Sequence, residues 1–188
     1  MRVIILLTVL CFIFISCNEY TPKPNAYPRI ERQESGTDTF IYSNFSFLYP
    51  QVAKIERIKN EGDSKFWFNI AYLQYDATIH CTYLKLDRNS LPKMLDEAYH
   101  FAYDHASKAE SISQIQYSDS LHKNTGILYD ISGQVASPVQ FYITDNVSNF
   151  IRGALYFNRE VKMDSVSPVV QYIRQDIIKL MESVQWSN

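Results

Sequence analysis

The N-terminal segment decides which part of this chain can fold and by what means. Arg2 is followed by an almost wholly apolar run over residues 3–15, then by the small residue Ser16 and by Cys17. A basic start, an apolar stretch of this length and a small residue before the cut are typical of a secretory signal peptide. The run is also too short to span a bilayer comfortably. We therefore expect residues 1–16 to be removed, so that the exported chain begins at Cys17.

A cysteine at the first exported position predicts a bacterial lipoprotein. Processing would attach a diacylglyceryl group to the Cys17 sulfur, cut after Ser16 and acylate the new amino terminus. The alternative is an ordinary secretory signal with an incidental cysteine, and Phe14 stands where leucine is commonest in lipoprotein signals. We expect a protein of the cell envelope that is held in the inner or the outer membrane by the Cys17 lipid, because several acyl chains give stable attachment.

Cysteine usage also limits how the exported domain is held together. Cys11 lies in the discarded run and Cys17 would carry lipid, so Cys81 alone remains and no internal disulfide can form. The domain must therefore be stabilised by its core, and the chain is long enough for one domain of ordinary size. Cys81 lies in an alternating apolar pattern, which indicates a buried and inert thiol.

Charge and composition argue against nucleic acid as a partner. The formal net charge is −2, and no run of lysine or arginine stands out. The chain has 14 tyrosines and 11 phenylalanines but only five glycines, which fits a sheet-rich exported domain. Tyrosine is also enriched at binding surfaces, so a protein- or sugar-binding surface is compatible with this composition.

The exported chain divides into a tether and one domain. Residues 17–44 are expected to form the lipidated cysteine and an extended tether. Three prolines within residues 18–28 exclude a helix, and residues 29–44 are polar and irregular. Residues 45–188 are expected to form a single α+β domain.

The period of the apolar residues predicts the elements of this domain. Strands are predicted over residues 45–49, 52–58, 66–72, 77–86, 127–131, 139–143 and 150–157. Helical spacing predicts one helix over residues 91–112, followed by a polar loop over residues 113–124. A final helix is predicted over residues 168–184, capped by Ser167 and packed through Ile173, Ile177 and Leu180. Short connections after residue 126 imply antiparallel neighbours, so the predicted fold is one antiparallel sheet covered by two helices.

Several blocks of the chain resemble the GldD family of gliding-motility lipoproteins. The resemblance rests on YPRI at 27–30, FSFLYP at 45–50, WFNI at 67–70, ATIH at 77–80, YDISGQVASPVQFYITD at 129–145 and FIRGALYFN at 150–158. It covers essentially the whole exported chain, including Cys17. It implies a cell-envelope lipoprotein that is required for gliding motility and linked to type IX secretion, with no established catalytic residues. The order of strands and helices is also similar to the PsbP and Mog1 fold.

The candidate binding surface is the connection over residues 133–139, with the sequence GQVASPV. Gly133, Gln134, Ser137 and Pro138 are small or mildly polar and join two strong strands. Loops fixed on rigid strands often carry binding. Because the core does not account for them, Gln134 and Ser137 are predicted to be exposed and to tolerate substitution. The alternative is a plain hairpin connection.

Recognisable catalytic motifs are missing from the sequence. The four histidines form no HExxH, Ser137 lies in no GxSxG, and no glycine-rich phosphate loop is present. His80 could line a groove or occupy an ordinary surface position, and Arg152 could pair with a carboxylate such as Asp130 or face solvent. We expect a non-enzymatic protein without metal or cofactor that binds other gliding-machinery or envelope proteins. An envelope hydrolase or a small-ligand-binding lipoprotein is the alternative.

Overall fold

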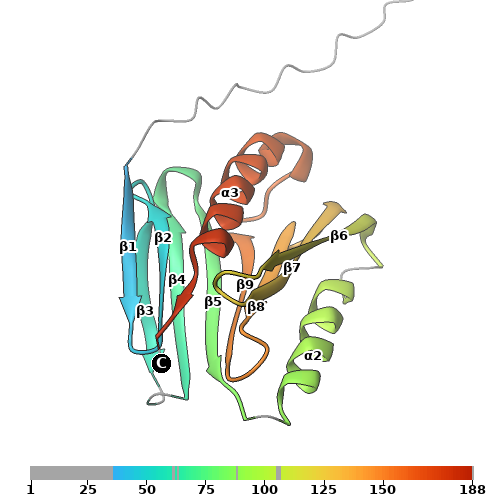
Figure 1. The fold of residues 1–188 in the computed structure, drawn as a ribbon. Helices are drawn as coiled ribbons and strands as arrows, with labels where there is room; N and C mark the ends of the chain where they lie inside the picture. Colours follow the sequence, from blue (N-terminus) through green and yellow to red (C-terminus); the bar gives the residue numbers. More distant parts are fainter. Residues whose placement is uncertain (1–35, 61, 63, 88, 105–106, 188) are drawn as a thin grey trace, which may run out of the picture.

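A computed structural model describes residues 36–60, 62, 64–87, 89–104 and 107–187. The predicted signal segment, Cys17 and most of the predicted tether lie outside these residues. The elements follow the chain in the order β1 (Thr37–Tyr42), β2 (Phe45–Pro50), β3 (Lys54–Asn60), β4 (Lys65–Tyr72), η1 (Leu73–Tyr75), β5 (Ala77–Lys85), α2 (Leu91–Tyr103), β6 (Ala109–Asp119), β7 (Asn124–Gly133), β8 (Val139–Thr144), β9 (Asn149–Phe157), α3 (Met163–Ser183) and β10 (Gln185–Trp186). The α+β prediction is confirmed (Figure 1).

The strands form two antiparallel sheets. One has the order β1-β2-β10 and the other has the order β3-β4-β5-β9-β8-β7-β6. The sequence predicted a single sheet, but β2 pairs with β1 before it and with β10 at the end of the chain. The small sheet packs on the large one through phenylalanine rings, with centroids 5.5 Å apart for Phe40 and Phe68 and 5.7 Å apart for Phe47 and Phe68. These rings bury a large apolar area, so the two sheets share one core.

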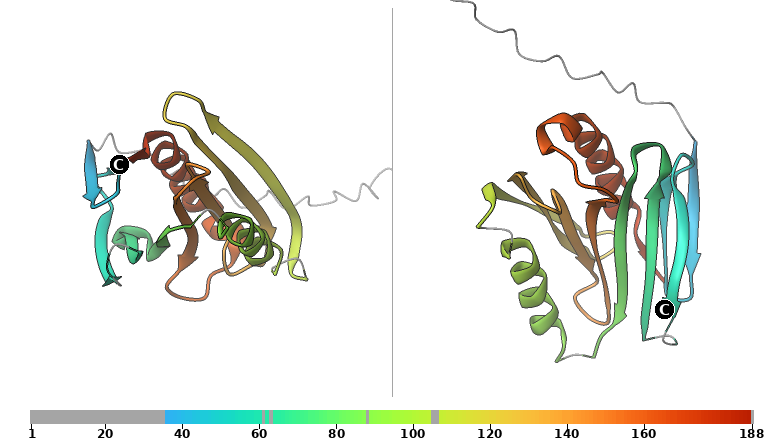
Figure 2. Two further views of the ribbon diagram at one scale, coloured as in Figure 1. Left: turned by 60° about the horizontal axis from the view of Figure 1, so that its bottom comes forward. Right: turned by 180° about the vertical axis from the view of Figure 1, so that it is seen from behind.

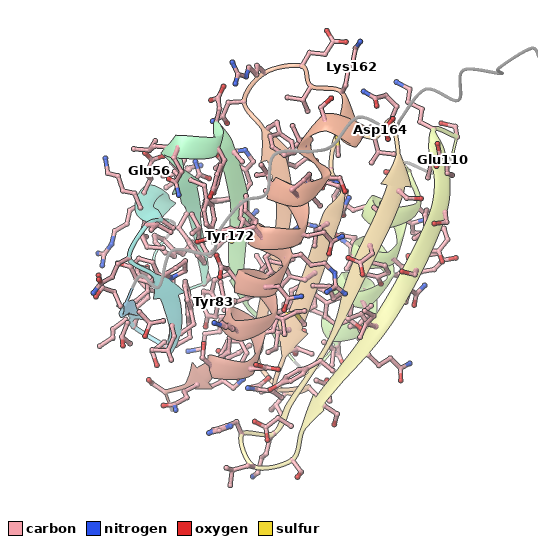
Figure 3. The ribbon with its side chains drawn as sticks, turned by 90° about the horizontal axis from the view of Figure 1, so that it is seen from above. Glu56, Tyr83, Glu110, Lys162, Asp164 and Tyr172 are labelled. Atoms are coloured by element: carbon pink, nitrogen blue, oxygen red, sulfur yellow. The ribbon has the colours of Figure 1, made fainter. Side chains whose placement is uncertain are left out.

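The two long helices lie on opposite faces of the large sheet. Successive residues of a strand point to opposite faces, and in β7 Leu128 joins the cluster under α3 while Tyr129 joins the cluster under α2. Seen from above, α3 runs across the middle of the molecule, between the small sheet and the β6–β7 hairpin (Figure 3). Ile173, Ile177 and Leu180 of α3 are buried, which confirms the predicted core stripe of this helix.

The folded domain begins earlier than the sequence indicated. Residues 37–42, predicted as the end of the tether, form β1 and pair with β2 along its whole length. Phe40 is the one residue of β1 that is buried. A single buried side chain produces no alternation, and for that reason the pattern of apolar residues gave no sign of this strand.

The first predicted helix ends nine residues early. It stops at Tyr103, and residues 109–119, predicted as helix and loop, form β6 instead. Ala109 and Ile112 are three residues apart, a spacing that mimics helical periodicity. β6 is an edge strand with most of its residues exposed, so no buried face imposes a period of two on its sequence.

The last helix begins at Met163, five residues before the predicted start. Pro168 therefore lies inside the helix, in its second turn, rather than at its first position. Proline has no N–H, so the helix lacks one hydrogen bond there. Ser167 is not its cap, because Lys162 occupies the N-cap position.

The turn between β8 and β9 is organised by Asp145. Its carboxylate accepts backbone N–H bonds from residues 147–149 at 2.8 to 2.9 Å, and a bond from Asn149 Nδ2 at 2.7 Å. Burial raises the pKa of Asp145, but the hydrogen bonds to its charged form prevail and hold this pKa below its ordinary value. The ionised carboxylate is therefore part of the folded state.

Replacing Asp145 by Asn should lower the free energy of unfolding at neutral pH by about 1–3 kcal/mol, since charged hydrogen bonds are lost. A depressed folded-state pKa contributes stability above the unfolded pKa of about 4, and that contribution disappears as the pH falls through the folded value. Urea unfolding at neutral and acidic pH should show a weaker acid dependence for D145N than for the wild type. Glu160→Gln, at an exposed position, is the matched control, and an unchanged acid dependence in D145N would contradict the assignment.

Candidate functional site

Several residues of the connection over residues 133–139 have structural roles that the sequence did not reveal. Gly133 has a φ of +101°, and a Cβ there would lie 2.8 Å from the backbone nitrogen of Glu110. Only glycine fits this left-handed position beside β6. Ser137 and Pro138 are buried, and the Ser137 hydroxyl donates to the Val139 carbonyl at 3.4 Å. The prediction that Ser137 is exposed is therefore wrong, and its burial removes the reason for expecting it to tolerate substitution.

Gln134 is exposed, as predicted, but it also holds the start of α3. Its Nε2 donates to the Val161 carbonyl at 2.8 Å, and its Oε1 accepts the Met163 N–H at 3.2 Å. Helix N-termini leave such N–H groups without an intrahelical partner, so this side chain serves as a cap from a distant loop. Partner binding by this connection stays a prediction, and it now concerns Gln134 and Ala136, which are exposed.

Asp130 belongs to an ion pair on the α3 face of the sheet. It accepts two bonds from Arg174, at 2.7 Å from Nε and 2.8 Å from Nη2, and this pair raises the pKa of Arg174. Arg152 lies on the opposite face. Of the two alternatives for Arg152, a pair with a carboxylate is found, but the partner is Glu97 and not Asp130. The bidentate geometry makes Asp130 and Arg174 a link between β7 and α3.

The face of the large sheet that α2 covers is only partly closed. α2 lies at the end of the sheet formed by β6, β7 and β8, and the portion over β4, β5 and β9 has no helix on it (Figure 2). We call this portion the open face. Its central residues are Trp67, Asn69, His80, Arg152 and Tyr156.

A cavity of about 410 Å³ lies where the open face meets α2. The register places Ala154 directly between His80 on β5 and Gln140 on β8. Ala154 in this row and Ala98 of α2 opposite it are both small, so they leave a space that larger side chains would fill. The polar residues of the lining are His80, Thr82, Asp104, Tyr129, Gln140, Arg152 and Tyr156.

Arg152 provides a permanent positive charge in this cavity. Its side chain is 31% exposed, its Cζ lies 4.4 Å from the centroid of the Phe101 ring, and its Nη1 is 3.9 Å from Glu97. Burial lowers the pKa of Arg152 and the charge of Glu97 opposes this effect. Arginine stays protonated in proteins regardless, so the cavity keeps a partly desolvated cation.

His80 was predicted either to line a groove or to occupy an ordinary surface position. It is exposed, and it lines the cavity. Its Nδ1 lies 2.8 Å from Asn69 Oδ1, and its ring centroid lies 5.6 Å from that of Tyr156. The partner of this imidazole is thus an amide, and no serine or cysteine is among the described residues of the lining. Nor do the described parts of the chain hold a group of three or more histidine, cysteine or acidic side chains arranged to bind a metal.

Sequence reasoning missed Trp67 and the cations around it. Lys59 Nζ lies 5.1 Å and Lys65 Nζ 4.3 Å from the centroid of the Trp67 ring. A bulge in β3 brings Lys59 opposite Trp67, and the sequence gives no sign of that bulge. The alternation of β4 was a usable signal, because Phe66 and Phe68 fill the core and Trp67 must then point the other way.

Comparison with known proteins gives one family. The family model described as the gliding motility lipoprotein GldD matches residues 17–186. No curated protein matches the chain. Within the residues that the structure describes, no helix is both long enough and apolar enough to cross a membrane.

Proposed function

The chain belongs to the GldD family of gliding motility lipoproteins, and we propose that it acts in gliding by binding another envelope protein through the open face. As a lipoprotein, it is a membrane-anchored protein of the cell envelope. Cys17 is the first residue of the family match, which supports it as the site of lipid attachment. The link to type IX secretion, which the family resemblance implies, is part of the same proposal.

The observation that carries the proposal is the residue content of the open face. The core accounts for the apolar residues on the other side of these strands, but not for Trp67, Tyr156 and Arg152. Tryptophan, tyrosine and arginine dominate the energetics of protein interfaces. All three are half-buried here, with part of each side chain left to contact a partner.

We propose that the protein has no catalytic turnover. The cavity contains the cation Arg152 and the histidine His80, whose hydrogen-bond partner is the amide of Asn69. These groups suit ligand binding more than nucleophilic catalysis. A small-ligand-binding lipoprotein or an envelope hydrolase is the second candidate, and the cavity itself is the observation in its favour. Hydrolytic activity of the purified protein that His80→Ala abolishes would favour that candidate.

The test of the proposed function is Trp67→Ala in cells. We expect gliding to be lost while the protein remains at its normal level in the membrane fraction. The matched control is Leu121→Ala, since Leu121 is 82% exposed in the β6–β7 connection, away from the open face. Cells with L121A should glide normally.

A second variant tests the open face independently, in case W67A has a folding defect. His80 is exposed, so His80→Glu should change the free energy of unfolding by no more than about 0.5 kcal/mol. Its new charge should still disrupt a contact over the open face. Normal gliding in H80E cells, with normal protein levels, would remove the open face from the gliding function.

A further inference from the structure

We propose that the cavity of the open face binds the carboxylate of an acidic side chain on an extended segment of the partner protein, with Arg152 as its counterion. This inference rests on the proposed function, because it specifies the chemistry of the partner at the same surface. Three observations carry it: the geometry of Arg152, the cations around Trp67, and the spacing between Trp67 and Arg152.

Two arginines on opposite faces of the sheet show what Arg152 lacks. Arg174 donates twice to Asp130 at 2.7 and 2.8 Å, the length of a charged hydrogen bond. The ion pair of Arg152 with Glu97 is 3.9 Å long, well beyond that range. A guanidinium offers five N–H donors in a planar fork that matches a carboxylate. Arg152 is therefore placed to bind a second carboxylate, one that lies closer and is better aligned than Glu97.

The walls of the cavity suit the rest of such a side chain. Phe101 lies against the guanidinium, and Ala98 and Ala154 leave room for a few atoms beside it. Desolvation by these apolar groups strengthens a charge pair formed inside the cavity. Asp104 also lines the cavity, but it is exposed at the C-terminal end of α2, where water screens its repulsion of an acidic ligand.

The charge of the open face extends the same preference beyond the cavity. Among the described residues of β3, β4, β5 and β9, this face carries one carboxylate, Glu56, and the four cations Lys54, Lys59, Lys65 and Arg152. The whole chain has a formal charge of −2, whereas these four cations and one carboxylate leave the strands of the open face with a net positive charge. Complementary potentials select the partner and orient it, which favours an acidic segment.

The register gives the spacing that such a segment must match. Trp67 and Arg152 lie in one row across the sheet, with Thr82 between them. Two strand spacings separate them, about 10 Å. Acidic side chains two residues apart on an extended chain are about 7 Å from each other. The long side chains of Lys59 and Lys65 can span the difference between this spacing and the distance from Trp67 to Arg152. We therefore expect two acidic residues with one residue between them.

The probe is the peptide acetyl-Asp-Phe-Asp-amide, with acetyl-Asn-Phe-Asn-amide as its neutral counterpart. NMR titration should show saturable shifts of the Arg152 Nε–H and Trp67 indole resonances with the acidic peptide. The neutral peptide should bind about tenfold more weakly or worse, because a charge pair is missing. Equal binding of the two peptides, or no saturable shift with the acidic one, would overturn the proposal.

Variants assign the binding to the cavity. Arg152→Gln should weaken binding of the acidic peptide about tenfold, and Arg152→Lys should weaken it less, because lysine keeps the charge and loses the fork. Arg159→Gln is the matched control, since Arg159 is 74% exposed and pairs with Asp76. Ala154→Leu should block binding by filling the cavity while all charges remain, which keeps the test valid if R152Q does not fold. Unchanged binding in both R152Q and A154L would place the peptide elsewhere and refute the site.

Two further probes separate the acidic segment from other anions. Inorganic phosphate should shift these resonances only weakly, since it has no apolar part. Vesicles of phosphatidylglycerol that broaden the same resonances, together with a failure of the peptide, would show a membrane-facing surface and overturn the proposal. These measurements use the purified domain and not motility, so a negative result here and normal gliding in the W67A and H80E cells are separate outcomes.

Discussion

Replacing Ile177 by Ala is expected to lower the free energy of unfolding by about 2–5 kcal/mol, because it removes buried atoms and leaves a cavity. Ile177 is fully buried in α3, within the core that α3, the small sheet and the large sheet share. The surroundings of such a buried site relax only partially into the space. Urea denaturation should show a lower midpoint with an unchanged slope, since the surface exposed on unfolding stays the same.

The matched control for this experiment is Gln175→Ala on the same helix. Gln175 is exposed, so its replacement should change the free energy of unfolding by no more than about 0.5 kcal/mol. An unfolding midpoint in I177A equal to that of Q175A would place α3 off the core. Reduced gliding of I177A cells would not identify a binding residue, because lower protein abundance has the same effect.

Sequence periodicity predicted the parts of the fold that bury one face. β4, β5 and β9 alternate between core residues and open-face residues, and α3 presents Ile173 and Ile177 to the core. In these elements the apolar residues of the predicted pattern are buried, and the predicted boundaries of the three strands lie within one residue of the observed ones. Cys81 is buried as predicted, and burial raises the pKa of its thiol.

The errors fall where burial is slight or depends on distant partners. β1 buries Phe40 alone, and β6 is an edge strand exposed along most of its length, so neither carries a strong period. The small sheet could not be predicted, because β2 pairs with β10 from the far end of the chain. The similarity to the PsbP and Mog1 fold stays a prediction.

The candidate site was harder to predict than the fold for a related reason. Sequence reasoning selected residues 133–139 because their polar character had no obvious structural cause. The structure supplies such causes in the positive φ of Gly133, the burial of Ser137 and the capping of α3 by Gln134. The open face depends on lateral neighbours from strands far apart in the sequence, such as Trp67 and Arg152, and register of this kind cannot be derived from one sequence.

The loop and the open face are nevertheless neighbours. Tyr156 lines the cavity of the open face and also a second cavity of about 470 Å³, which Gln134 and Ala136 line as well. A partner that covers the open face could therefore reach the exposed side chains of the loop. In that arrangement the loop contributes contacts at the margin, and Trp67 and Arg152 lie nearer the centre, where binding energy is concentrated.

Replacing Cys17 by Ala is expected to abolish the lipid-anchored form of the protein. Without the thiol no diacylglyceryl group can be attached, and each methylene removed from the membrane costs about 0.8 kcal/mol of binding. Fractionation should show loss of the processed protein from the membranes, and mass spectrometry should find no lipid on the remaining chain. Gliding should be lost with it, since the open face would no longer be held beside its partner in the envelope.

The matched control is Cys81→Ala, which removes the other cysteine of the exported chain. Cys81 is buried on β5, so this change should cost some stability but leave the lipid and the membrane attachment intact. The two variants together separate the chemistry of the Cys17 sulfur from a general need for cysteine. A C17A protein that is cut normally and stays in the membranes would show that residues 1–16 are an ordinary secretory signal, and the anchor would then have to lie elsewhere.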